Sequence, residues 1–244
     1  MDHFGQLKQI RHKGPVDLVS EADLASEAVI VSTIGDAFPE HSIIAEEGDY
    51  EATVNPKFRW VIDPLDGTTN YVHGLPLFAV SIAFQINGVT ELGLVFNPAL
   101  NEKFMALRGR GTTLNDQPIQ VSNVGDISAA LLVTGFPYTH DEIFARSFDL
   151  FANLYPMCQG VRRLGAAALD CCYVAAGRFD AFYEANLQPW DICAGDLICR
   201  EAGGQTSDWT GGKLPFDGRR ALLSNGHLHA ELARIISASP AGKV

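Results

Sequence analysis

The feature that most constrains the fold is a pair of apolar runs, residues 78–86 and 89–96, separated by the dipeptide Asn87-Gly88. Asn-Gly between two such runs is the strongest short-range signal for a β-hairpin. We therefore predict two neighbouring antiparallel strands in the first half of the chain. Residues 42–45 and 59–62 are predicted as further short strands, and each of them runs into acidic residues.

Helices and strands alternate in both halves of the sequence. Near the start, residues 20–23 resemble a helix capping box, and four apolar residues come after it at helical spacing: Leu24, Ala28, Val31 and Ile34. The second half predicts strands at 130–134, near 161 and at 181–183, with helices at 141–154, 165–176, 190–201 and 227–237. Mixed elements in both halves favour a layered α/β architecture. A polar, turn-rich stretch at 121–126 is the predicted boundary between residues 1–123 and 124–244.

Charge and composition exclude several classes of protein. The chain has 244 residues with 18 Lys+Arg and 29 Asp+Glu, a net charge of −11, so it offers no broad basic face for nucleic acid or an anionic membrane. A small anionic substrate remains open, because a bound cation can invert the local field. The five cysteines are odd in number and predict no disulfide framework. No apolar stretch is long enough to span a bilayer, and we expect a cytoplasmic protein.

The most informative segment is residues 63–70, Asp-Pro-Leu-Asp-Gly-Thr-Thr-Asn. The proline keeps Asp63 extended at a strand end, and Asp66 precedes a glycine turn. Thr68 and the two residues after it can cap the next element of the chain, which leaves backbone N–H groups pointing outward. Two carboxylates beside free N–H groups suit a metal-bound phosphate.

A structural role for the same residues is the alternative, because Asp-Pro and Asp-Gly are common turn dipeptides. The wider context favours function. Glu46-Glu47 ends another predicted strand, and Asp191 opens a predicted helix far along the chain. Converging carboxylates repel one another unless cations neutralise them, and an all-oxygen donor set favours Mg²⁺ over Zn²⁺.

Five motifs, in this order along nearly the whole chain, resemble the inositol monophosphatase family: residues 17–23, 45–48, 60–70, 190–191 and 201–204. The bacterial inositol-1-monophosphatase branch is most similar, notably through residues 132–137 and 177–180. The resemblance implies an αβαβα sandwich of the inositol monophosphatase and sugar phosphatase type. It also implies a Mg²⁺-dependent, lithium-sensitive phosphomonoesterase of inositol metabolism, usually a homodimer.

The resemblance also implies a set of metal ligands. Glu46, Asp63 and the Leu65 carbonyl would hold a first Mg²⁺ ion. Asp63, Asp66 and Asp191 would hold a second ion, with Asp63 bridging the two. A weaker third ion would lie near Glu46. Two such ions can clamp the attacking water and the leaving oxygen of an in-line displacement, so no enzyme nucleophile is needed.

Other roles carried over from the family concern water and substrate. Thr68 paired with Asp23, together with Glu46, would orient the attacking water. The expected substrate contacts are Asp66, Gly67, Thr68, Gly165, Ala166, Ala167, Glu184 and Asp191, where the Gly67 and Thr68 amides hold the phosphate. Ala166 stands where relatives often carry a hydroxyl residue, which removes one possible hydrogen bond to the sugar.

Several conspicuous residues have simpler interpretations. A basic residue often approaches the site from the region of Arg11, His12 and Lys13; Lys13 is preferred here, although a solvated basic turn is commoner. Relatives usually carry a longer first helix, which only residues 1–10 represent here. Core packing is expected for Cys193 and Cys199, and solvent exposure for His73. Arg162-Arg163 could meet phosphate, a partner subunit or a structural ion pair, and Glu47 could orient Glu46.

The favoured function is hydrolysis of a myo-inositol monophosphate to inositol and phosphate. One alternative keeps the chemistry and changes the ester to another sugar, polyol, histidinol or nucleotide phosphate. The other alternative is a regulatory or binding protein on the same fold. The number of placed carboxylates argues for catalysis.

Overall fold

The computed structural model describes residues 4, 10–12, 18–48, 50 and 55–243 of the chain. The elements of the first half are β1 (Ile10–His12), β2 (Leu18–Ser20), α1 (Glu21–Ala37), β3 (His41–Ala45), β4 (Asn55–Asp66), α2 (Thr68–Val72), β5 (Ala79–Ile86), β6 (Val89–Asn97), β7 (Glu102–Leu107), β8 (Thr112–Leu114) and β9 (Gln117–Pro118). Those of the second half are η1 (Ile127–Ala129), β10 (Leu131–Thr134), α3 (Glu142–Leu154), η2 (Tyr155–Met157), β11 (Gly160–Arg162), α4 (Ala167–Ala175), β12 (Ala181–Ala185), α5 (Pro189–Glu201), β13 (Gln205–Ser207), β14 (Arg220–Ser224), α6 (His229–Ala238) and η3 (Pro240–Lys243).

The strands form two large mixed sheets. The first has the order β3-β4-β5-β6-β7-β8-β9, in which only the β3–β4 pair is parallel. The second has the order β11-β10-β12-β14-β13, with β10 parallel to both β11 and β12 and with antiparallel β14 and β13. Strands β1 and β2 form a separate antiparallel pair.

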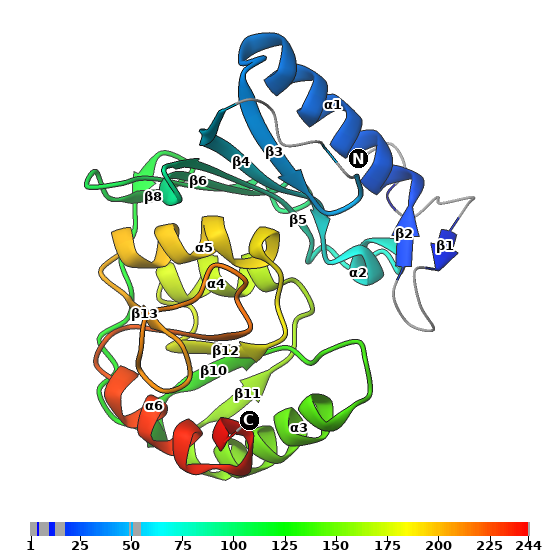
Figure 1. Ribbon diagram of the computed structural model, residues 1–244. Coiled ribbons are helices and arrows are strands. Elements are labelled where there is room, and N and C mark those ends of the chain that lie inside the picture. Colours follow the sequence, from blue (N-terminus) through cyan, green and yellow to red (C-terminus); the bar gives the residue numbers. More distant parts are fainter. Residues whose placement is uncertain (1–3, 5–9, 13–17, 49, 51–54, 244) are drawn as a thin grey trace.

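Helices and sheets alternate in five layers (Figure 1). Helix α1 covers the outer face of the first sheet, α4 and α5 lie between the two sheets, and α3 and α6 cover the far face of the second. Strand alternation explains this order, since neighbouring residues point to opposite faces. In β4, Val61 joins the central core while Ile62 packs toward α1; in β12, Phe182 joins the central core while Tyr183 packs toward α3 and α6. The predicted αβαβα sandwich is confirmed.

The predicted hairpin is present. Strands β5 and β6 pair from Val80 with Phe96 to Ile86 with Val89. The connecting Asn87 and Gly88 have φ angles of 52° and 75°, both in the left-handed region that a type I′ turn requires. Strands β7, β8 and β9, which continue the same antiparallel sheet, were not predicted from the sequence.

Helix α1 is present, and the second half of the predicted apolar face is correct, because Val31 and Ile34 pack into the core. The first half of that face is wrong. Leu24 is 45% exposed and Ala28 is also exposed, whereas Asp23 and Glu27 are buried together with Ile34. The N-terminal part of the helix therefore turns acidic side chains inward. Their partners belong to the candidate site described below.

The two halves share one core. The chain crosses between the sheets at residues 119–126, where the domain boundary was predicted, and α4 and α5 then pack against both sheets. The division into 1–123 and 124–244 stays a prediction. All five cysteines are free, as expected, and four of them are buried. Among the described residues, no helix combines the length and apolarity that a membrane crossing needs.

Candidate active site

The end of β4 bends so that two aspartates leave the sheet together. The pairing of β4 with β5 is regular up to Asp63 opposite Ser81, then shifts, and resumes at Asp66 opposite Ala79. Within the bend the Leu65 amide donates to Asp63 Oδ1 at 2.9 Å. Gly67 comes next with a φ of 87°, and a Cβ atom there would lie only 2.9 Å from the Leu77 carbonyl oxygen. Only glycine therefore fits this turn, which starts α2 directly after Asp66.

Acidic side chains from three other places in the chain converge on this bend. Glu46 comes directly after β3, Asp191 lies in the first turn of α5, and Asp23 comes from α1. Glu46, Asp63, Asp66 and Asp191 line one small cavity of about 60 Å³ together with Leu65, Gly67, Thr68, Thr69 and Tyr138. The structure thus brings together every residue that was predicted to bind metal.

Repulsion and burial govern the charge state of this cluster. Burial is the main cause that raises the pKa of Asp63 well above its usual value, and the charges of Glu46, Asp66 and Asp191 raise it further. Burial likewise raises the pKa of Asp66 to about 7, against the lowering effect of backbone amides. The pKa of Asp191 is raised mainly by burial as well. Carboxylates in such surroundings need either protons or cations, so the donor chemistry fits a divalent metal.

The donor set also indicates which metal. All candidate donors are carboxylate or carbonyl oxygens, which suit Mg²⁺ with several waters in its shell. Within the residues that the structure describes, no group of three or more His, Cys, Asp or Glu side chains is arranged to hold a metal ion as it stands. Mg²⁺ in phosphate-binding sites is usually held by one or two carboxylates together with waters and substrate oxygens.

Thr68 is held by a buried carboxylate. Its Oγ1 donates to Asp23 Oδ1 at 2.8 Å and also lies 3.1 Å from the Leu65 carbonyl oxygen. The bond to Asp23 is charge-assisted and is the stronger of the two. With its hydrogen directed at Asp23, the hydroxyl keeps its lone pairs available to accept a hydrogen bond in the cavity.

Glu27, one turn after Asp23 in α1, is a positioning residue that was not predicted from the sequence. Its Oε2 accepts from the Glu47 amide at 2.9 Å and its Oε1 from the Tyr50 hydroxyl at 2.7 Å. These bonds fix the segment that carries Glu46. A signal was available, because Asp23 and Glu27 are four residues apart and so share one helix face.

A second cavity of about 80 Å³ adjoins the first, and Asp66, Asp191 and Tyr138 line both. Its wall contains all the residues expected to contact the sugar: Gly165, Ala166, Ala167 and Glu184. Asp66 joins the two cavities, because its oxygens accept from the amides of Ala167 at 3.1 Å and Ala168 at 2.8 Å. Glu184 is half-buried, and desolvation raises its pKa to about 8.

The same cavity contains residues that sequence reasoning did not assign to it. Asp170 and Tyr138 line it, and so does Arg163, for which several roles were left open. Within the described part of the chain Arg163 forms no ion pair, so the structural ion pair is not its role there. Asn70 connects the halves beside the site, where its Nδ2 donates to the carbonyl oxygens of Leu77 and Leu164 at 2.7 and 2.8 Å.

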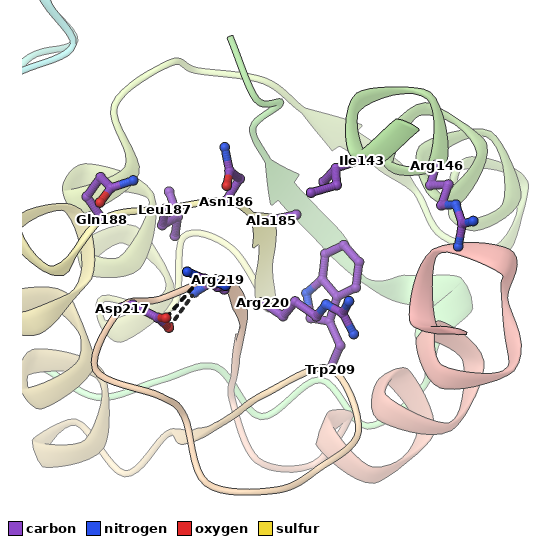
Figure 2. A pocket seen from close by; sticks show the side chains of 10 residues that line it. All are labelled: Ile143, Arg146, Ala185, Asn186, Leu187, Gln188, Trp209, Asp217, Arg219 and Arg220. Atoms are coloured by element: carbon purple, nitrogen blue, oxygen red, sulfur yellow. Dashed lines mark hydrogen bonds and ion pairs between the residues drawn. The ribbon is translucent and has the colours of Figure 1, made fainter. Parts of the chain in front are cut away.

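A larger cavity of about 360 Å³ is lined in part by residues 185–188 (Figure 2). Arginines dominate its polar lining, and Arg219 is paired there with Asp217 at 2.9 Å. It shares Leu187 with the Glu184 cavity but contains no cluster of carboxylates among its described lining residues. We therefore assign the candidate active site to the two smaller cavities in spite of their size.

The remaining expectations have mixed outcomes. Cys193 is buried in the core and accepts a weak hydrogen bond from Gln85, Cys199 is buried as well, and His73 is exposed, as predicted. Lys13 lies outside the described residues, and so do the side chains of Arg11 and His12. Their approach to the site stays a prediction, as does the role of Glu47.

The fold is an αβαβα sandwich in which strand and helix ends bring buried carboxylates to a small polar cavity. This combination defines a class of phosphatases that work with divalent cations. The chain belongs to one family within that class. It is a member of the inositol monophosphatase family, whose sequence model matches residues 1–241.

Individual relatives carry two kinds of name. The chain is 45% identical to "Nus factor SuhB" of Pasteurella multocida, over 92% of this chain and 81% of that protein. It is 42% identical to the inositol-1-monophosphatase of Synechocystis sp., over 97% of this chain and 83% of that protein. The structure of an inositol monophosphatase from Thermotoga maritima superposes with a TM-score of 0.89 and 36% identity, covering 97% and 90% of the two chains. Phosphatases of the inositol monophosphatase type are thus similar in both sequence and fold.

Proposed function

We propose that the protein is a Mg²⁺-dependent phosphomonoesterase that hydrolyses myo-inositol monophosphate to inositol and inorganic phosphate. The observation that carries this proposal is the group of four acidic side chains around one cavity, directly beside a second cavity that contains Glu184. A phosphate ester has the same two parts. Its charged phosphoryl group needs cations, and its hydroxyl-rich leaving group needs hydrogen-bond acceptors.

The metal assignment is that of the family. Glu46, Asp63 and the Leu65 carbonyl would hold one ion, and Asp63, Asp66 and Asp191 a second, with a weaker third ion near Glu46. Bound ions would supply Lewis-acid stabilisation of the phosphoryl oxygens and of the leaving alkoxide.

The protein's own groups position the reactants. The Thr68 hydroxyl, oriented by its bond to Asp23, accepts a hydrogen bond from the attacking water, and Glu46 restricts the same water from the neighbouring end of β3. The amides of Gly67 and Thr68, at the glycine turn, donate to the phosphate oxygens. Phosphoryl transfer depends mainly on such positioning and on charge neutralisation, so no serine, cysteine or histidine nucleophile is required.

The leaving group would lie in the second cavity. Gly165, Ala166 and Ala167 form a close backbone wall, and Glu184 accepts hydrogen bonds from ring hydroxyls. Asp66 and Asp191 border both cavities, so the ester bond would cross between them.

A regulatory role on the same fold is the second candidate, because the relative in Pasteurella multocida is named a factor rather than an enzyme. Other small phosphate esters are the alternative within the phosphatase class. The retained carboxylates and the Thr68–Asp23 pair support catalysis over a purely regulatory role, since binding a partner has no chemical need for them.

The test is a phosphate-release panel with Mg²⁺ that contains myo-inositol-1-phosphate, sugar phosphates, histidinol phosphate and nucleotide monophosphates. We expect the inositol ester to be the best substrate, and Asp191→Asn to abolish its turnover at limiting Mg²⁺. Fast turnover of another ester with negligible turnover of the inositol ester would refute the substrate. No turnover of any ester by the folded, Mg²⁺-supplied protein would favour the regulatory candidate.

Three further properties belong to this proposal. Inhibition by lithium is tested by titrating Li⁺ at fixed Mg²⁺. A homodimer is tested by sedimentation of the intact chain. A cytoplasmic location is consistent with the five free cysteines and is tested by cell fractionation.

A further inference from the structure

The wall of the Glu184 cavity contains a buried carboxyl group without a hydrogen-bond partner at one of its oxygens. Asp170, in the first turn of α4, is only 1% exposed, and its Oδ1 has no hydrogen-bond partner within the described structure. All its neighbours from Ala168 to Ala175 in the helix are buried too. Buried polar atoms in folded proteins are almost always paired, so such an atom that borders a cavity indicates a missing hydrogen-bond donor.

Arg163, the cation among the described residues that line the same cavity, also lacks a direct partner. Its charge acts on both Asp170 and Glu184, yet it forms no ion pair with any residue that the structure describes. Its guanidinium group lies against Gly165, where a Cβ atom would collide with Nη1. The Glu184 carboxylate lies against Gly135 in the same way. Two glycines thus make room for one charged group each.

Asp170, Glu184 and Arg163 line one cavity and have complementary chemistry. Asp170 and Glu184 offer acceptors, and Arg163 offers donors, but within the described structure none of these acceptors is joined to the donors directly. A hydroxyl group can bridge such an arrangement, because it donates one hydrogen bond and accepts others. A leaving group without hydroxyls would leave Asp170 Oδ1 buried and unpaired.

We infer that Asp170 and Arg163 determine leaving-group specificity: a hydroxyl of the substrate, next to the one that meets Glu184, donates to Asp170 Oδ1 and accepts from Arg163. The inference rests on the proposed function and extends it. The two residues would select esters of polyols that have neighbouring hydroxyl groups. It adds two residues to the expected contacts. Burial and the nearby Glu184 charge raise the pKa of Asp170. This is consistent with a carboxyl group that is shielded from water and has no hydrogen-bond donor at Oδ1.

The experiment compares kcat/KM for two esters in the intact protein with Mg²⁺. One is the polyol phosphate that the wild type hydrolyses fastest, and the other is p-nitrophenyl phosphate, whose leaving group has no hydroxyl donor. Asp170→Leu keeps the branched shape of the side chain and removes both acceptors. We expect it to lower kcat/KM for the polyol ester about ten- to hundredfold, the effect of one hydrogen bond to a charged group, and to leave p-nitrophenyl phosphate within about threefold.

Conservative variants and controls separate recognition from folding. Asp170→Asn retains an acceptor and should restore part of the preference for the polyol ester over p-nitrophenyl phosphate. Arg163→Gln should reduce this preference without a loss of stability, because Arg163 is exposed. The matched controls are Asp180→Asn, a buried aspartate bonded to Ser122 and Leu131, and Arg234→Gln, an exposed arginine of α6. Both controls should leave the ratio of the two kcat/KM values unchanged. Binding of free myo-inositol, measured by calorimetry, should weaken in the Asp170 and Arg163 variants alone.

The outcomes are distinct. If the ratio is unchanged in Arg163→Gln and in a folded Asp170→Leu, or if both esters are affected equally, the inference is overturned. Should Asp170→Leu not fold, Arg163→Gln decides alone. A wild type that prefers a polyol ester other than inositol phosphate contradicts the proposed substrate but not this inference. A wild type without preference for any polyol ester contradicts both.

Discussion

In the absence of divalent cations, the protein should become less stable as the pH rises. The prediction depends on Asp66, a buried carboxylate whose pKa is raised from 3.8 to about 7. Burial is the main cause, and the nearby Glu46 charge adds to it, while the amides of Ala167 and Ala168 oppose the shift. Between these two pKa values the folded protein holds a proton that the unfolded chain has released.

The sign and size of the effect come from proton linkage. Because the folded state binds the proton more tightly, its contribution to stability is complete below the unfolded pKa and is lost as the pH rises through about 7. The difference between a pKa of 3.8 and one of about 7 corresponds to about 4 kcal/mol. For a chain of this size, 1 kcal/mol changes the melting temperature by roughly 2–4 °C, so the loss should amount to about 10 °C.

The assay is thermal unfolding followed by circular dichroism in EDTA, at a series of pH values from about 4 to 8. The melting temperature should fall across this series, and Mg²⁺ should restore it at the alkaline end but change little at the acidic end, where protons already neutralise the site. Asp66→Asn should flatten the curve in EDTA and abolish the rescue by Mg²⁺. Asp149→Asn, an exposed aspartate of α3, should behave as wild type. A melting temperature in EDTA that is constant or rises with pH would refute the reasoning.

Three further predictions concern single residues. Thr68→Ala removes the hydroxyl held by Asp23, and kcat should fall about 10²–10⁴-fold with an unchanged KM, as steady-state kinetics would show, while the melting temperature should fall slightly because buried Asp23 loses a donor. Asp191→Asn should weaken the second metal, so the Mg²⁺ concentration for half-maximal activity should rise at least tenfold; an unchanged Mg²⁺ dependence would contradict its assignment. Asn70→Ala loses two bonds that join the halves and should cost about 2 kcal/mol in urea unfolding, whereas a wild-type midpoint would show that these bonds do not stabilise the protein.

Much of the fold can be predicted from local sequence signals. The Asn87-Gly88 turn fixes the β5–β6 hairpin because both residues accept positive φ angles at low cost. Helices α3 and α6 of the second half, which bury one face each, are predictable from their apolar periodicity. Strand order is not predictable in this way, since the placement of β10 between β11 and β12 depends on contacts between distant segments. Only the family resemblance gave the order of the layers.

The acidic residues of the candidate site could be predicted for a related reason. Asp63, Asp66, Glu46 and Asp191 all lie at ends of strands or helices, where acidic residues interrupt apolar runs visibly in the sequence. The sequence does not show directly that these residues converge. Their convergence requires β3 and β4 to be parallel neighbours and α5 to return beneath the first sheet. The larger arginine-lined cavity had no local signal, since its residues come from α3, β12 and the segment before β14.

Asp23, Glu27 and Asp170 were not assigned to the inner face of a helix or to the Glu184 cavity from apolar patterning. They stand inside helices and do not mark the end of an apolar run. In α1 the spacing of Leu24 and Ala28 suggested an apolar inner face, but a helix has only one side toward the sheet, and Asp23 and Glu27 occupy it. In α4 Asp170 stands in an otherwise apolar helix, where periodicity alone treats it as a surface residue. Burying a carboxylate without a partner is costly, so evolution retains one only where something compensates. A single acid within a buried helix therefore merits the same weight as acidic residues at strand ends. In this chain such acids hold Thr68, anchor the segment after Glu46 and line the cavity that contains Glu184.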